Sequence, residues 1–120
     1  MKKLLKKWQA ILGLTDWVID LRDNCKPDDF VLQNVNGECE YNEMLKCAVI
    51  RLLDEKYYEK RVLPYDKEKT LIHELLHIKL SFLQESGNDL QERIVHQLID
   101  DLAKSFVAVK KEKLSKDGKS

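Results

Sequence analysis

The sequence has few of the features that mark a secreted, membrane-bound or nucleic-acid-binding protein. It contains three cysteines, Cys25, Cys39 and Cys47. An odd number of cysteines without a C-x-x-C pair argues against a full disulfide framework. No apolar run is long enough to span a membrane. The formal net charge is zero, so the whole chain has no electrostatic bias towards nucleic acid or anionic membranes.

The ends of the chain also lack targeting or strong binding signals. Polar residues interrupt the first apolar stretch, so it does not resemble the apolar core of a signal peptide. We therefore expect a cytoplasmic protein with no membrane partner. Lysines gather at both ends, as Lys2, Lys3, Lys6 and Lys7 and again from Lys110 onward. Such clusters are usually solvated faces, so we regard a nucleic-acid partner as unlikely.

The length and the order of the sequence patterns indicate one domain. The chain has 120 residues, without an internal repeat or a low-complexity linker. We predict a single domain over residues 1–112 and a flexible basic tail over residues 113–120. The sequence does not indicate an oligomeric state.

Hydrophobic periodicity and turn residues predict an α+β fold. The N-terminal helix should precede a small, mostly antiparallel sheet of about three strands, and two further helices should follow it. The last helix is long and amphipathic. The predicted elements, in order, are helix 2–12, strands 17–22, 37–42 and 46–53, helix 66–83 and helix 89–111. A short turn near residues 42–43 should join the last two strands, and Asp66 is the expected N-cap of the second helix.

The most specific pattern is His73-Glu74-Leu75-Leu76-His77, which matches the H-E-x-x-H signature of many metallopeptidases. On a helix, residues i and i+4 share one face, so both imidazoles can reach one metal ion. The neighbouring carboxylate borders that face and can act on a metal-bound water. The alternative is that both histidines are ordinary core residues or partly exposed residues that bind no metal. A metal ion explains the two histidines and the glutamate better, because burying unpaired polar groups in an apolar helix costs free energy.

A catalytic zinc normally takes three protein ligands and leaves one position for water. The third ligand must come from another element, and Glu92 and His96 lie one turn apart on the last predicted helix. A short break over residues 86–89 would make the two helices antiparallel neighbours. We prefer Glu92 as the ligand, with His96 supporting the site through a hydrogen bond to Glu92 or His73. The reverse assignment, with His96 as the ligand, stays open.

Together with residues 92–96 (Glu-Arg-Ile-Val-His), the motif resembles the gluzincin branch of zinc metallopeptidases. It looks most like the small phage-associated and mobile-element proteins with a minimal zincin-like domain. The resemblance covers roughly residues 10–110, and no metzincin-type extension follows His77. It implies that a helix after the motif helix presents the glutamate ligand. It also implies that the strand over residues 46–53 is the sheet edge that binds an extended peptide.

The expected chemistry is zinc-assisted hydrolysis of a peptide bond in a protein or peptide substrate. Glu74 would take a proton from the attacking water and pass it to the leaving amine. Tyr57, Tyr58 and Tyr65 are candidate donors to the developing oxyanion. The alternative is a zinc-binding regulatory module without proteolytic activity. An intact Glu74 favours the enzyme, because a purely structural zinc site does not need that carboxylate.

Overall fold

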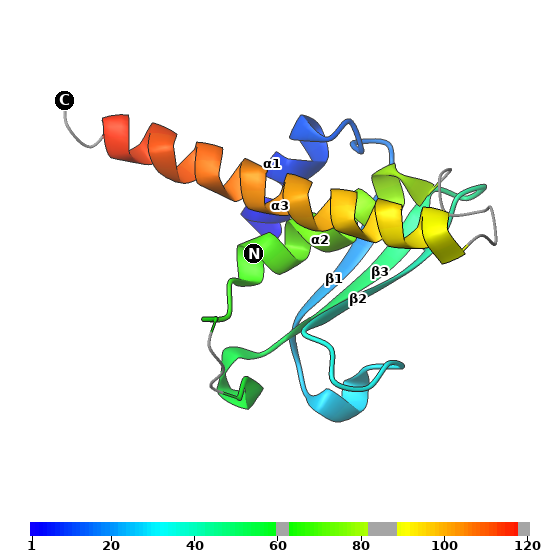
Figure 1. Cartoon of the computed structure of the whole chain (residues 1–120). Helices are drawn as coiled ribbons and strands as arrows, with labels where there is room; N and C mark the ends of the chain where they lie inside the picture. The colour runs from blue at the N-terminus through cyan, green and yellow to red at the C-terminus, as the bar shows by residue number, and fades with distance from the viewer. Residues whose placement is uncertain (60–62, 82–88, 118–120) are drawn as a thin grey trace.

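The described residues fold into three α-helices and a three-stranded sheet, which is the α+β class predicted. The computed structural model describes residues 1–59, 63–81 and 89–117. Figure 1 shows the helices gathered on one side of the sheet. The elements are α1 (Lys2–Ile11), β1 (Val18–Cys25), β2 (Gly37–Asn42), β3 (Cys47–Leu53), α2 (Lys67–Lys79) and α3 (Asp89–Asp117), with short 3₁₀ turns at Pro27–Asp29 and Glu55–Tyr57.

The sheet is mixed, so the prediction of a mostly antiparallel sheet was wrong. The strand order is β1-β3-β2, with β1 parallel to β3 and β2 antiparallel to it. The predicted hairpin of β2 and β3 is confirmed, with Gly37 opposite Leu52 and Asn42 opposite Cys47. The strand β3 takes the central place because it is the most apolar of the three, and a central strand has neighbours on both sides.

The strand over residues 46–53 is therefore not the sheet edge that the resemblance implied. The edges are β1 and β2, and β2 is the edge strand that packs beside α2. A strand at a sheet edge has one row of unpaired backbone N–H and C=O groups. Among the described residues no strand pairs with the outer side of β2, and the strand packs against the helix that carries the H-E-x-x-H motif.

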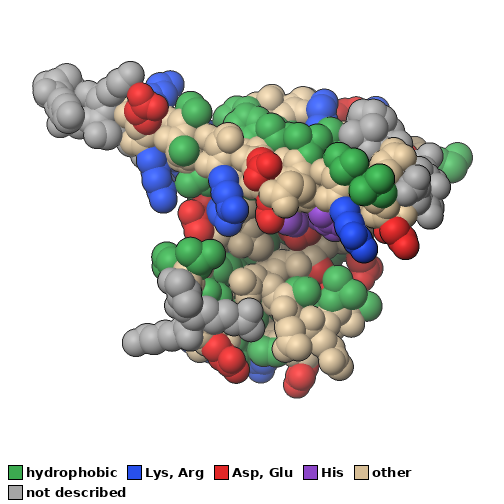
Figure 2. Space-filling view, in the orientation of Figure 1, with side chains coloured by type: hydrophobic (Ala, Val, Ile, Leu, Met, Phe, Trp, Pro, Cys, Tyr) green, Lys and Arg blue, Asp and Glu red, His purple; other side chains and the backbone are tan. Residues whose placement is uncertain are grey.

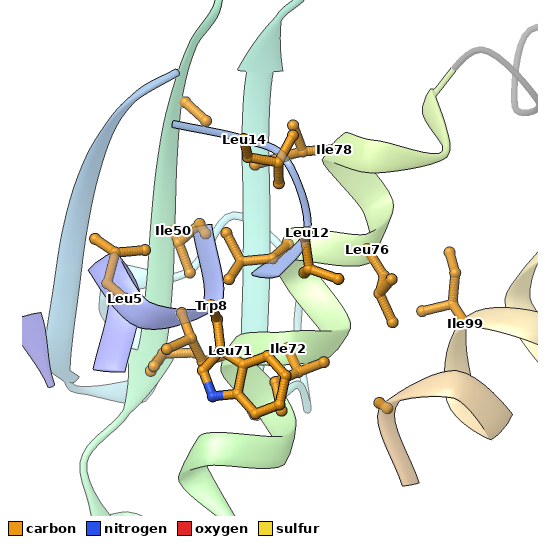
Figure 3. Close-up of a cluster of buried hydrophobic side chains, with 14 of the residues drawn as sticks. Leu5, Trp8, Leu12, Leu14, Ile50, Leu71, Ile72, Leu76, Ile78 and Ile99 are labelled. Carbon is orange, nitrogen blue, oxygen red and sulfur yellow. The ribbon is translucent and has the colours of Figure 1, made fainter. Parts of the chain in front are cut away.

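The helix α2 lies at the centre of the hydrophobic core (Figure 3). Its apolar residues contact α1, the sheet and α3, and Leu71, Ile72 and Leu75 are fully buried. Burying a side chain of this size stabilises the fold by about 1.5–3 kcal/mol. The residues that surround α2 include Leu5 and Trp8 of α1, Leu12 just after this helix, Ile50 and Leu52 of β3, and Val95, Ile99, Ala103 and Val107 of α3.

Hydrogen bonds to the backbone and to the side chains hold the first turn of α2 in place. Asp66 caps the helix as predicted, because its carboxylate accepts from the Lys69 amide at 3.0 Å. Glu68 accepts from the indole N–H of Trp8 at 2.9 Å and from the ammonium group of Lys110. These bonds link α1 and α3 to the start of α2.

The helix α3 packs antiparallel to α2 and continues to Asp117, past the end predicted near residue 111. Within this amphipathic helix, Leu90 and Ile94 are 65% and 59% exposed. The neighbouring row through Val95 and Ile99 is buried instead. Part of the predicted break, residues 86–88, and the end of the predicted tail, residues 118–120, lie outside the described residues.

Gly37 controls how closely β2 approaches α2. A Cβ atom at this position would lie 2.6 Å from Cγ2 of Thr70 and 3.3 Å from Oε2 of Glu74. The first distance is well below van der Waals contact, and threonine is stiff at χ1. The absence of a side chain therefore lets the edge strand lie directly against the motif helix.

We predict that Gly37→Ala lowers the free energy of unfolding by about 1–3 kcal/mol, because overpacking forces β2 away from α2. Urea unfolding of the metal-free protein measures this change. Thr70→Ser removes the clashing methyl group and keeps the hydroxyl that donates to the Asp66 carbonyl at 3.0 Å. The double variant should recover most of the loss. Equal stability of Gly37→Ala and wild type would contradict the close approach.

Candidate metal centre

The two histidines of the motif lie side by side on the face of α2 that borders α3 and β2. Their Nε2 atoms are 3.2 Å apart, and their ring centroids are 4.9 Å apart. Two nitrogens bound to one tetrahedral zinc, each about 2.0–2.1 Å from the metal, would be roughly 3.3 Å apart. The spacing of His73 and His77 therefore fits two ligands of one zinc ion.

Asp100 of α3 orients the first of these histidines. Its Oδ1 lies 3.2 Å from Nδ1 of His73. A donor hydrogen at Nδ1 leaves the lone pair of Nε2 available for a metal, as a carboxylate beside a metal-binding histidine usually does. Sequence reasoning missed Asp100. The available signal was the spacing of Glu92, His96 and Asp100, which places all three on one face of a helix.

The structure brings His96 to the motif. Its ring centroid is 5.1 Å from that of His77, with the rings nearly perpendicular. Because α2 and α3 are antiparallel, His96 lies opposite His77 and Asp100 lies opposite His73. Glu92 lies one turn before His96 in α3. Because the two helices are antiparallel, Glu92 is level with the part of α2 that follows His77. Its side chain is exposed and lines neither part of the cleft described below.

The described side chains do not form a complete set of metal ligands. Within residues 1–59, 63–81 and 89–113, no group of three His, Cys, Asp or Glu side chains is positioned to hold a metal ion. The two motif histidines are at ligand spacing, and a third ligand requires a change of side-chain rotamer. Rotation of an exposed side chain such as His96 needs no rearrangement of the backbone.

Glu74 is a buried carboxyl group beside the histidines. Its side chain is 6% exposed, and it points towards the start of β2 at Gly37. Burial raises the pKa of Glu74 to about 8, and the negative charge of Glu38 adds to this shift. A carboxyl group with a pKa near neutrality suits proton transfer in both directions.

His73 is held in its neutral form. Burial lowers the pKa of His73 below its ordinary value, and the charges of His96 and Lys69 act in the same direction. The contact with Asp100 opposes this shift without reversing it. A neutral imidazole is the form that binds a metal.

A cleft passes through the site between the helices and β2, and Figure 2 shows histidine side chains facing this recess. One half has a volume of about 540 Å³ and includes Tyr41, His77 and His96. The other half has a volume of about 580 Å³ and includes Tyr58, Lys69 and Asp100. Four residues line both halves and so mark the middle of the cleft: Val35, Gly37, His73 and Glu74.

The candidate oxyanion donors are mostly engaged elsewhere. The hydroxyl of Tyr65 donates to the Leu53 carbonyl at 2.7 Å, and that of Tyr58 donates to the Leu63 carbonyl at 2.5 Å. The ring of Tyr57 lies beneath the ammonium group of Lys56 and away from both halves of the cleft. Tyr41 lines the cleft beside His77 and His96, and sequence reasoning did not single it out.

The cysteines, the helices and the comparisons with known proteins add the following observations. Cys25, Cys39 and Cys47 are free thiols. Among the described helices, none is long and apolar enough to cross a membrane. Comparisons with protein-family models, with curated proteins and with solved structures find no match to this chain.

The raised pKa of Glu74 predicts how the stability of the metal-free protein depends on pH. Glu74 binds its proton more tightly when folded, so it lowers the free energy of unfolding as pH rises from 4.5 to about 8. The lowered pKa of His73 gives the opposite slope up to its unfolded pKa, 6.5. Comparing wild type with Glu74→Gln isolates the carboxyl group, because both proteins share the histidine.

We expect Glu74→Gln to gain several kcal/mol over wild type between about pH 5 and about pH 8 in the presence of a chelator. Urea unfolding at each pH measures the difference. Glu43→Gln, which changes an exposed turn carboxylate, serves as the matched control and should show no such gain. A difference between Glu74→Gln and wild type that does not change with pH would contradict the raised pKa.

Proposed function

We propose that this protein is a zinc-dependent hydrolase that cleaves peptide bonds in an extended segment of a protein or peptide. One observation carries the proposal. The two Nε2 atoms of His73 and His77, 3.2 Å apart, lie beside the buried carboxyl group of Glu74 and next to an edge strand of the described sheet. A metal ligand pair, a proton carrier and a peptide-binding strand then meet in one cleft.

In this proposal His73 and His77 hold the zinc, and His96 is a better third ligand than Glu92. The antiparallel packing of α2 and α3 places His96 opposite His77, whereas Glu92 lies a turn beyond it. Three imidazoles with one open position are a known ligand set for catalytic zinc. Asp100 would orient His73 through Nδ1.

Bound zinc would polarise the scissile carbonyl and lower the pKa of its water. The carboxylate of Glu74 would accept a proton from the attacking water and deliver it to the leaving nitrogen. The oxygen of the water becomes part of the new carboxyl group, the C–N bond breaks, and no oxidant or reductant is needed. Burial raises the pKa of Glu74 in the metal-free protein, and the positive charge of bound zinc would favour the carboxylate form that the first proton transfer needs.

The edge strand β2 would bind the substrate. No strand in the described part of the chain pairs with its outer side, so an extended peptide would add to the sheet there through backbone hydrogen bonds. The missing side chain at Gly37 allows β2 and its bound peptide to approach Glu74 closely. This assigns to β2 the role that the resemblance gave to the neighbouring strand.

A zinc-binding module without proteolytic activity is the second candidate. The observation in its favour is that Tyr58 and Tyr65 donate to backbone carbonyls, which removes two of the candidate oxyanion donors. The buried position of Glu74 favours hydrolysis over this alternative, because a binding module gains nothing from a costly buried carboxyl group.

We predict that the zinc-loaded protein cleaves peptides and that Glu74→Gln lowers the rate by about 100-fold or more, because proton transfer contributes that much. Mass spectrometry of a complex peptide mixture measures cleavage, and elemental analysis measures zinc. Glu74→Gln should keep its zinc, and the exposed-site control Glu43→Gln should keep both zinc and activity.

Two results would separate the candidates. Zinc binding without cleavage by the wild type would favour the non-proteolytic module. Equal cleavage by wild type and Glu74→Gln would show that the activity does not come from this site.

A further inference from the structure

The sheet has a second edge strand, β1, which the proposed hydrolysis does not use. The strand order β1-β3-β2 puts β1 and β2 at opposite edges (Figure 1). Among the described residues, no strand pairs with the outer side of β1. Backbone N–H and C=O groups along such an edge offer a template for pairing with another chain. The strand β1 is therefore a candidate interaction surface, and none of its residues lines the cleft.

The pairing with β3 shows which residues of β1 direct their backbone groups outward. The amide of Val18 donates to the Lys46 carbonyl at 3.0 Å, so the backbone groups of Val18 point towards β3. Alternate residues of a strand direct these groups to the same neighbour. The regular register from residue 18 to residue 22 therefore gives Asp20 and Arg22 the same direction as Val18. The N–H and C=O groups of Ile19 and Leu21 point to the open side.

Asp20 and Arg22 are exposed charged side chains on one face of this strand. Arg22 donates to Asp20 through Nε at 3.2 Å and through Nη2 at 3.1 Å. The two side chains are 57% and 56% exposed, so both remain accessible to a partner. Ile19 and Leu21 lie on the other face and pack against the core. The strand thus presents one acidic and one basic residue, on either side of Leu21.

Charge selects one register for pairing with a second copy of β1. A two-fold axis beside Asp20 or beside Arg22 would place that residue opposite its own copy, and like charges destabilise a strand pair. An axis beside Leu21 instead places Asp20 of each copy opposite Arg22 of the other. These become non-hydrogen-bonded pairs, in which facing side chains are closest, while the two Leu21 residues exchange backbone hydrogen bonds. The sequence of β1 is therefore complementary to itself in this register.

The other edge strand lacks this complementarity. The charged side chains of β2 are Glu38 and Glu40, and both are acidic. Antiparallel pairing of two β2 strands around Cys39 would place these glutamates opposite each other, which is unfavourable. Pairing between two copies of the chain therefore favours β1 over β2.

We propose that the protein forms a two-fold symmetric dimer through β1, with the antiparallel pair centred on Leu21. The two three-stranded sheets then join into one continuous sheet, with a β2 strand and its cleft at each end. Two-fold dimers are the commonest protein oligomers, and every contact in them occurs twice. This inference does not depend on the proposed hydrolysis, because the dimer and the cleft use opposite edges of the sheet.

Sedimentation equilibrium of the full chain, over a range of concentrations, tests the dimer. Two paired strands form a smaller contact than a permanent interface, so we expect a Kd on the order of 10–100 μM. Asp20→Arg and Arg22→Asp each place like charges at both cross-strand pairs and should raise the Kd by about tenfold or more. The altered side chains are exposed, so circular dichroism of each variant should match wild type.

Two further arms separate charge pairing from a general effect of the substitutions. The exchange variant Asp20→Arg/Arg22→Asp restores opposite charges across the pair and should dimerise like wild type. An equimolar mixture of the Asp20→Arg and Arg22→Asp chains sets two basic residues against two acidic ones. It should form heterodimers at concentrations where neither variant dimerises alone. Glu43→Arg, an exposed change in the turn after β2, is the matched control and should leave the Kd unchanged.

Three results would overturn the proposal. Wild type that stays monomeric up to about 1 mM would exclude the dimer. A wild-type dimer whose Kd neither single variant changes would assign the contact to another surface. Single variants that stay monomeric when mixed would contradict the pairing of Asp20 with Arg22 across the two-fold axis.

Discussion

The burial of α2 is the constraint on which the rest of the structure depends. Its apolar residues are surrounded by α1, β3 and α3, so the helix has little freedom to shift or rotate. A close-packed core holds side chains in fixed rotamers and keeps neighbouring elements in register. The polar face of the same helix, with His73, Glu74 and His77, is therefore held at a fixed position beside the edge strand.

That polar face carries an electrostatic cost that the fold does not need. Burial raises the pKa of Glu74 and lowers that of His73, so both groups favour their neutral forms in the metal-free protein. Buried ionisable groups with shifted pKa values often mark functional sites. In the proposed zinc-loaded protein, the positive charge of the metal would stabilise the ionised form of Glu74.

Local signals in the sequence predicted local structure well. The cap at Asp66, the hairpin of β2 and β3 and the helical motif follow from neighbouring residues. The position of β1 and the identity of the edge strand depend on how distant strands pair, so periodicity could not predict them. The choice between Glu92 and His96 likewise depends on the register of α3 against α2, which long-range contacts decide.

The most direct test of the metal centre is X-ray absorption spectroscopy of the zinc-loaded protein, with zinc content measured in His96→Ala and Glu92→Ala. We predict about one zinc per chain with three imidazole ligands, a set known from catalytic zinc sites. Zinc should be lost in His96→Ala and kept in Glu92→Ala. Two imidazoles with a carboxylate, together with zinc loss only in Glu92→Ala, would contradict the assignment of His96. A wild type that binds no zinc would contradict the metal centre itself.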